Sequence, residues 1–163
     1  MLIAMNEFSL QKAIETRGEA RKKGMVFALT NGCFDVLHAG HAFSLNKASE
    51  LGDILFVGLN SDNSVKKIKG NQRPINSQDN RAYLLNSLEA VNGVFIFEAQ
   101  NLAKEILLLK PDIYVKSDDY SYETINAEER EALIKVGAQV HFVPLMKDLS
   151  SSLIIEKMKG QSI

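Results

Sequence analysis

The feature that most constrains the fold is a set of five apolar runs of strand length, which alternate with segments of helical periodicity. The runs are rich in Val, Ile and Phe and cover residues 25–30, 53–60, 93–98, 112–117 and 138–144. Helices are predicted over residues 9–23, 40–51, about 77–89, 101–109, about 126–136 and about 150–159. Apolar strands joined by helices are typical of a parallel sheet with helices on both faces. The sequence therefore predicts an α/β fold, a Rossmann-like, doubly wound sheet of five parallel strands.

The length and charge of the chain limit the classes of protein that it can belong to. With 163 residues, of which 45% are hydrophobic, we expect a single domain over residues 25–163 after an N-terminal helical extension over residues 1–24. The net charge of −1 gives no general attraction to nucleic acid or to a membrane, so an anionic ligand must be bound by a local cluster. No run approaches the length of a membrane span.

The cysteine content indicates the compartment. Cys33 is the only cysteine, which excludes an intrachain disulfide and a zinc site built from cysteines. The first residues become polar too soon for the apolar core of a signal peptide. We therefore expect a cytoplasmic protein in a reducing compartment.

Ligands of doubly wound sheets bind beyond the carboxyl ends of the strands, where the strand order reverses. The segments to inspect are therefore residues 30–41, 60–76, 116–120 and 144–152. In the first of them, "TNGCFDVLHAGHAF", we expect Asn31 and Gly32 to form a turn and Gly40 to lie beside the start of a helix. Backbone N–H groups at such a turn form an anion site.

Two of the three histidines of the chain lie in this segment. His38 and His41 are three residues apart, so they share one face of the first helical turn. Spacing alone leaves open a chance pair, a capping pair or half of a metal site, although no third ligand is evident nearby. There is no Walker A sequence and no GxGxxG, which excludes the usual phosphate loops.

The stretch "GCFDVLHAGH", residues 32–41, resembles the GxFDxxHxGH signature of the HxGH nucleotidyltransferases. The resemblance implies that His38 and His41 contact the phosphates of a bound nucleoside triphosphate. It also implies that attack on the α-phosphorus releases pyrophosphate, with Lys69 as a third catalytic residue.

Residues 26–158 are similar to the adenylyltransferase domain of bacterial ADP-heptose synthases, through "LGDILFVGLNSDNSVKKIKG", "RPINSQDNRAYLLNSLEAV", "KPDIYVKSDDY" and "LSSSLIIEKM". The resemblance implies transfer of AMP from ATP to a sugar 1-phosphate such as heptose 1-phosphate. Because the chain holds no sugar kinase segment, we expect the stand-alone form of that domain. The substrates would be a nucleoside triphosphate and a sugar or polyol phosphate, and the resemblance allows a homodimer.

The nucleotide-binding residues follow from the resemblance and from the strand ends. They are Thr30, Asn31, Gly32, Cys33, Phe34, Gly40, Arg73, Arg81, Lys116, Asp119, Ser150 and Ser151. Some of these segments also have simpler explanations: the lysine-rich stretch before Arg73 as a solvated patch, "KSDDY" as a solvated loop, and Ser150 as a helix N-cap. His141 lies inside the fifth predicted strand, where we expect a structural role.

In the nucleotidyl transfer that the resemblance implies, the protein must position the reacting phosphates and neutralise their charge. A general base or a protein nucleophile is needed less. We therefore expect no dedicated metal site, and Mg²⁺ held mainly by the phosphates of ATP.

Two departures from this resemblance lie near the expected nucleotide site. "KSDDY", residues 116–120, stands where the close family reads Lys-Gly-Gly-Asp-Tyr, and Asp148 stands where a glycine is usual. Glycerol-3-phosphate cytidylyltransferase, or a related polyol-phosphate cytidylyltransferase, is the alternative, because its loop Gly-Asp-Asp-Trp is closer to "SDDY". A nucleotide-binding regulatory module without catalysis is the third interpretation.

Overall fold

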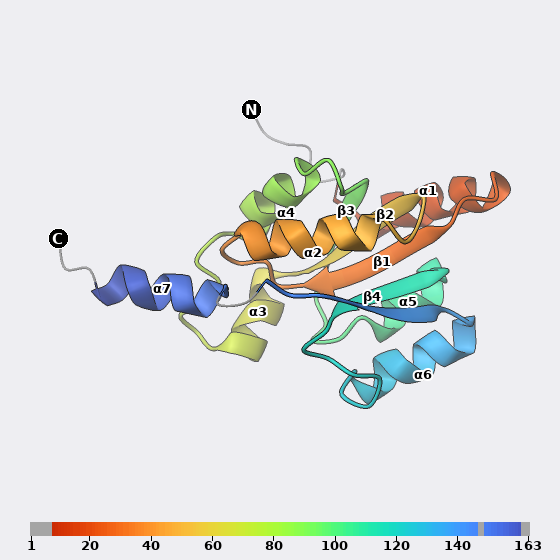
Figure 1. The fold of residues 1–163 in the computed structure, drawn as a ribbon. Helices are drawn as coiled ribbons and strands as arrows, with labels where there is room; N and C mark the ends of the chain where they lie inside the picture. The colour runs from red at the N-terminus through yellow and green to blue at the C-terminus, as the bar shows by residue number, and fades with distance from the viewer. Residues whose placement is uncertain (1–7, 147–148, 161–163) are drawn as a thin grey trace.

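The fold is a five-stranded parallel sheet between two layers of helices (Figure 1). The computed structural model describes residues 8–146 and 149–160. The strand order is β3-β2-β1-β4-β5, and the strands are β1 (Phe27–Gly32), β2 (Ile54–Asn60), β3 (Gly93–Phe97), β4 (Ile113–Ser117) and β5 (Gln139–Val143). The order reverses between β1 and β4, which pair with Ala28 opposite Ile113. This confirms the predicted doubly wound sheet and places its switch point at the end of β1.

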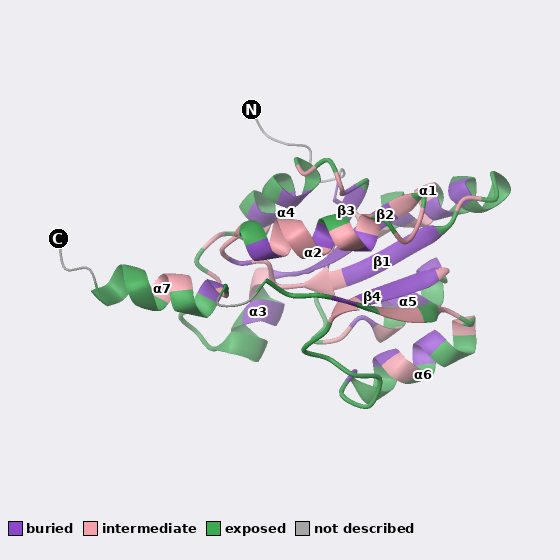
Figure 2. Ribbon diagram, in the orientation of Figure 1, coloured by how far each residue is buried: buried purple, intermediate pink, exposed green. Residues whose placement is uncertain are grey.

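Helices cover both faces of the sheet. On one face, α2 (Ala39–Ser49) and α4 (Gln78–Asn86) pack against the strands, and on the other lie α1 (Leu10–Lys22), α5 (Ala103–Leu109) and α6 (Ala127–Val136). Along β1, Ala28 belongs to the first core and Phe27 and Leu29 to the second. The strands β1 to β4 are consequently buried on both sides over most of their length, as Figure 2 shows for β1 and β4, whereas the edge strand β5 is only partly buried.

Two further helices, α3 (Asp62–Lys69) and α7 (Ser151–Gly160), lie beyond the carboxyl ends of the strands (Figure 1). The α3 helix was not predicted, and its segment was only named for inspection as part of residues 60–76. Its only apolar residues are Val65 and Ile68, too few for a visible helical period, but the Ser61 hydroxyl caps it by accepting from the Ser64 N–H. Sequence reasoning therefore missed the helix over residues 62–69.

The end of β1 also differs from the prediction. A turn was expected at Asn31 and Gly32, but both residues are in the strand and pair with Gly58 and Leu59 of β2. Glycine at position 32 has a steric explanation, because a Cβ there would lie 2.9 Å from the ring of Phe34. The strand thus carries Asn31 to the switch point instead of turning away before it.

The α1 helix is anchored to the second face. Ala13 and Ala20 are buried in its core, and the Arg17 guanidinium donates to Asp112 Oδ1 at 2.7 Å and to the Lys110 carbonyl at 3.0 Å. Over the described residues, every helix is too short or too polar to cross a membrane.

Candidate active site

A cavity of about 360 Å³ opens at the carboxyl ends of β1, β4 and β5, and we call it the strand-end pocket. Its walls come from the end of β1 and the turn after it, one side of α2, the last residue of α3, the end of β4 with the loop after it, and residues 145–146 and 149–151. Every residue of the predicted site except Arg73 and Arg81 lines it: Thr30, Asn31, Gly32, Cys33, Phe34, His38, Gly40, His41, Lys69, Lys116, Asp119, Ser150 and Ser151. The structure thus brings together residues from positions 30 to 151 of the chain.

The two histidines meet at the start of α2. His38 is the N-cap residue, and its ring stacks on that of His41 with centroids 3.8 Å apart and planes 22° apart. The intervening Gly40 makes room for this arrangement, since a Cβ there would lie 3.0 Å from two atoms of the His38 ring. The prediction that both rings share one face of the first turn is confirmed.

Both imidazoles are poorly solvated. Burial lowers the pKa of His38, and burial, with the nearby His38 and Lys69, lowers the pKa of His41 to about 4. The Nδ1 atoms of both rings are buried and have no hydrogen-bond partner among the described residues. Both rings are therefore neutral at neutral pH, and each has one N–H to donate and one nitrogen that can accept a proton.

Cys33 follows β1 on the pocket wall. Its thiol lies 3.8 Å from Asn60 Oδ1, and burial raises its pKa against the opposing effect of Lys69 and Arg81. A protonated, half-buried thiol is a packing group and not a nucleophile.

Asp35, which was not singled out from the sequence, organises the turn after β1. It is buried, and it accepts from Arg73 Nε, from the Ile75 N–H at 2.7 Å and from the Asn76 N–H at 3.0 Å. Burial alone would raise the pKa of Asp35, but these hydrogen bonds lower it. Arg73 therefore lies behind the pocket wall, with its Nη2 buried and without a partner in the part of the chain that the structure describes.

Arg81 does not present its guanidinium to the pocket. Its side chain is fully buried and donates to the Asn76 carbonyl, the Cys33 carbonyl and Asp62 Oδ1. The guanidinium that was predicted to bind the nucleotide thus binds groups of the protein itself. In this arrangement Arg81 joins the turn after β1 to the start of α3.

The wall formed by the end of β4 is more polar than the sequence indicated. Lys116 Nζ donates to Asn31 Oδ1 at 2.6 Å and lies 5.1 Å from the centre of the Tyr120 ring. The Ser117 hydroxyl donates to Asp119 Oδ1 at 2.6 Å. Ser117 and Tyr120 line the pocket as well, although neither was assigned a role from the sequence.

The last wall is the start of α7. The Ser150 hydroxyl accepts from the Leu153 N–H at 3.2 Å, which confirms the predicted N-cap, and the Ser151 hydroxyl donates to the Val36 carbonyl at 3.0 Å. Asp148, the departure noted above, lies outside the described residues.

Sequence reasoning missed the apolar part of the pocket. Periodicity marks the members in helices and strands only as core. The members after β5 lie in a segment that was named for inspection, but their apolar side chains were not assigned to the site. The apolar lining residues are Leu45, Ala48, Val115, Val143, Leu145, Met146 and Leu149, and the hydroxyl of Ser44 was missed as well.

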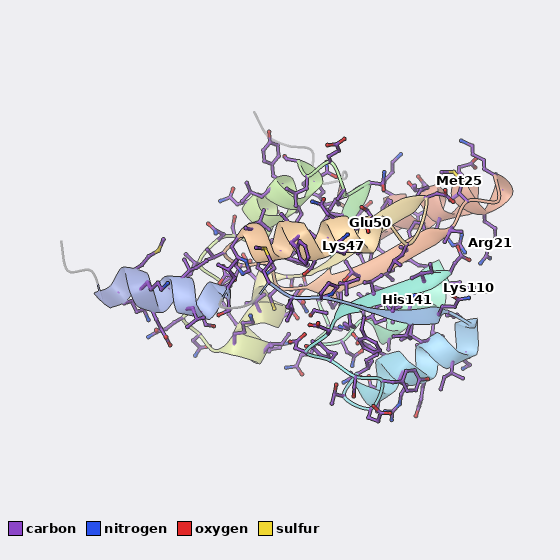
Figure 3. The ribbon with its side chains drawn as sticks, viewed as in Figure 1. Arg21, Met25, Lys47, Glu50, Lys110 and His141 are labelled. Carbon is purple, nitrogen blue, oxygen red and sulfur yellow. The ribbon has the colours of Figure 1, made fainter. Side chains whose placement is uncertain are left out.

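The third histidine lies away from the pocket, as expected. His141 is on the edge strand β5, and Figure 3 shows it apart from the start of α2. Arg21, Met25 and Lys110 mark the opposite end of the sheet in the same figure. Within residues 8–146 and 149–160, no group of three metal-ligating side chains is present.

Comparison with known proteins agrees with this geometry. A bifunctional protein HldE from Helicobacter pylori (strain HPAG1) is 48% identical over 150 residues, 92% of this chain and 30% of that protein. Another, from a Nitratiruptor species, is 45% identical over 142 residues, 87% of this chain and 29% of that one. The chain thus spans less than a third of the length of these relatives.

Among solved structures, the lipopolysaccharide core biosynthesis protein from Thermoplasma volcanium GSS1 is 30% identical, with a TM-score of 0.62 over 76% of this chain and 98% of that one. Pantoate-beta-alanine ligase from Francisella tularensis shares the fold alone, at 14% identity and a TM-score of 0.57 over 94% of this chain and 78% of that one. Residues 29–157 match the model of the cytidylyltransferase-like family, and the stacked histidines lie in the strand-end pocket of this segment. The chain belongs to the cytidylyltransferase-like family.

Proposed function

We propose that the chain is a nucleotidyltransferase that moves AMP from ATP to a sugar 1-phosphate such as heptose 1-phosphate and releases pyrophosphate. The observation that carries the proposal is the stacked pair His38 and His41 at the switch point of the sheet, in a pocket that also holds Lys69. The Nδ1 atoms of both rings have no hydrogen-bond partner among the described residues. The names of the relatives support the assignment to this pathway: two are bifunctional HldE proteins and one is a lipopolysaccharide core biosynthesis protein.

The reaction requires in-line displacement at phosphorus. A phosphate oxygen of the acceptor forms a bond to the α-phosphorus of ATP, and the bond from that phosphorus to the oxygen bridging to the β-phosphorus breaks. The electron pair leaves with pyrophosphate, so the acceptor needs no deprotonation. The protein must therefore position two anions and stabilise the charge that spreads over the phosphoryl oxygens.

The groups in the pocket suit this task. The imidazole N–H groups of His38 and His41 can donate to phosphate oxygens, and the Lys69 ammonium adds a positive charge. The amide groups at the start of α2 and the Ser150 and Ser151 hydroxyls supply further donors. The polar groups of the pocket that these segments supply are thus mainly hydrogen-bond donors, which suit a bound anion.

Magnesium is expected to enter with ATP as part of the substrate. The described residues hold no cluster of metal-ligating side chains, and the pocket around the histidines is built from donors of hydrogen bonds instead of oxygen ligands. Such a site suits an ion that is bound by phosphates and water.

The remaining members of the predicted site keep distinct roles in this proposal. Lys116 and Asp119 are assigned to the nucleoside, because they line the pocket at the carboxyl end of β4 and in the loop after it. Arg73, predicted to bind the nucleotide, is assigned instead to the support of Asp35 and the turn after β1, and Arg81 to the support of the Cys33 carbonyl. A cytoplasmic location and a homodimer stay predictions; light scattering after size exclusion would measure the latter.

Pyrophosphate release tests the proposal. ATP, CTP and GTP are each combined with heptose 1-phosphate and with glycerol 3-phosphate, and ³¹P NMR identifies the product. We expect turnover with ATP and heptose 1-phosphate. Turnover only with CTP and glycerol 3-phosphate would favour the alternative, and binding of nucleotide without turnover of any pair would favour a regulatory module.

The His41→Ala variant connects the activity to the histidine pair. It should lower turnover at least about a hundredfold, the scale for removing one preorganised donor. His141→Ala is the matched control, because it removes a histidine outside the pocket. Near-normal turnover of His41→Ala would remove His41 from the mechanism.

A further inference from the structure

We propose that Glu129 of α6 is a positioning residue, which holds the Lys116 ammonium charged at the floor of the strand-end pocket and directed toward the bound nucleotide. The inference rests on the proposed function and deepens it, because it assigns a role to a residue that does not itself line the pocket. Glu129 acts through Lys116 and is not expected to touch the substrate.

The two side chains form an ion pair of which one side faces the pocket. Lys116 Nζ lies 3.6 Å from Glu129 Oε2, and the side chains are 10% and 4% exposed. Lys116 lines the pocket, whereas Glu129 lies behind it, on the helix that covers the second face of the sheet. A third polar partner, Asn31 Oδ1, accepts from Lys116 Nζ at 2.6 Å.

Glu129 is held by three other segments of the chain. Its Oε1 accepts from the Leu102 N–H at 2.8 Å and from Asn31 Nδ2 at 3.3 Å. The Tyr114 hydroxyl lies 3.1 Å from its Oε2 and 2.9 Å from Asn31 Oδ1, and can donate to one of them at a time. Because these contacts fix the carboxylate, the ammonium that pairs with it is fixed as well.

The charge of Lys116 depends on this pair. Burial lowers the pKa of Lys116, and Glu129 opposes that effect by favouring the charged form. The other groups facing Lys116 are Asp119 and Tyr120 of the following loop, Tyr114 of its own strand, and Asn31 and Cys33 at the end of β1. Asp119 is exposed, so Glu129 is the buried carboxylate among them.

One contact of Glu129, the hydrogen bond that its Oε1 accepts from the Leu102 N–H, could stabilise the fold without any role in the pocket. The variant Glu129→Gln separates the two roles, because glutamine keeps the size and an accepting oxygen but removes the charge. Glu128→Gln is the matched control on the same helix, where the carboxylate is exposed and accepts from Asn101 Nδ2 at 2.7 Å.

The first measurement needs no activity. NMR of isotope-labelled lysine follows the titration of Lys116 in the ligand-free protein, with the signal assigned by its absence from Lys116→Met. Glu129→Gln should lower the midpoint by at least about one pH unit, the effect of losing one close opposite charge, and Glu128→Gln should leave it unchanged. An unchanged midpoint in Glu129→Gln would overturn the proposal.

The second measurement uses ATP. Glu129→Gln should raise the KM for ATP at least about fivefold with a smaller change in kcat, as expected for lost binding. In the Lys116→Met background the same substitution should have no further effect on KM. An equal effect in both backgrounds would show that Glu129 acts through structure alone.

These measurements distinguish a failure of the proposed function from a failure of the proposal for Glu129. If the wild-type protein turns over no substrate pair, the proposed function fails, while the lysine titration still decides whether Glu129 controls Lys116. If Glu129→Gln does not fold, Lys116→Met decides: it should raise the KM for ATP, or the Kd by calorimetry, and an unchanged value would refute the proposal.

Discussion

Binding of ATP should draw a proton from solvent onto the histidine pair. In the free protein His41 has its pKa lowered to about 4, mainly by burial. A triphosphate beside the ring brings several negative charges, which favour the charged imidazolium and raise the pKa again. Because the two rings are stacked 3.8 Å apart, we expect one proton to be shared by the pair instead of two.

The size of the uptake follows from the two pKa values. At pH 6.5 a histidine with a pKa of about 4 is well under about 1% protonated, and one restored to the ordinary value of about 6.5 is half protonated. Binding should therefore take up about half a proton at pH 6.5 and less than about a tenth of a proton at pH 8. A larger rise of the pKa would increase both numbers.

Isothermal titration calorimetry measures this uptake. MgATP is titrated in buffers of different ionisation enthalpy, and the slope of the observed enthalpy against that quantity gives the number of protons. His41→Asn should lose most of the uptake, and the control His141→Asn should keep it. No uptake in the wild-type protein, or an equal uptake in His41→Asn, would refute the assignment of His41 to the phosphates.

Two other predictions concern the residues that shape the pocket. Gly40→Ala adds a methyl group 3.0 Å from the His38 ring and should lower kcat/KM at least about tenfold, because it displaces that donor. Gly18→Ala is the control, since a Cβ there meets nothing within 4 Å. Equal activity of the two variants would contradict the packing argument. Asp35→Asn leaves Arg73 without its charge partner and should cost about 3–5 kcal/mol in urea unfolding. Because the pKa of Asp35 is lowered, its carboxylate stabilises the fold fully above the ordinary pKa of 3.8, and this stabilisation is lost as the pH falls through the lowered pKa. The Asp35→Asn variant should not show this loss of stability in acid.

Much of the fold was predictable because strand signals are local. Five runs of apolar residues marked five strands, and their alternation with helices gave the parallel sheet. The segment of α3 carried little of this signal, since Ser61 caps a helix that is mostly lysine and polar residues. The dipeptide Asn31-Gly32 by itself is typical of a turn, but its pairing with β2 in the sheet keeps it extended. Tertiary pairing overrode local preference there.

The site shows the same limit. The signature located the histidines, and the strand ends located Lys116 and Asp119, because both depend on position in the chain. The direction of Arg81 depends on partners such as Asp62, whose approach no local pattern reveals. Glu129 is one of three glutamates at the start of a helix, and the sequence does not show which of them points inward.

The strand-end pocket draws its walls from both halves of the chain, from Thr30 near the start to Ser151 near the end. While the chain is being synthesised, a fragment that stops before β4 lacks Lys116 and both serines and cannot form the complete pocket. A nucleotide that touches both halves would then act as a bridge between segments more than a hundred residues apart. Its binding energy would resist unfolding of the whole domain.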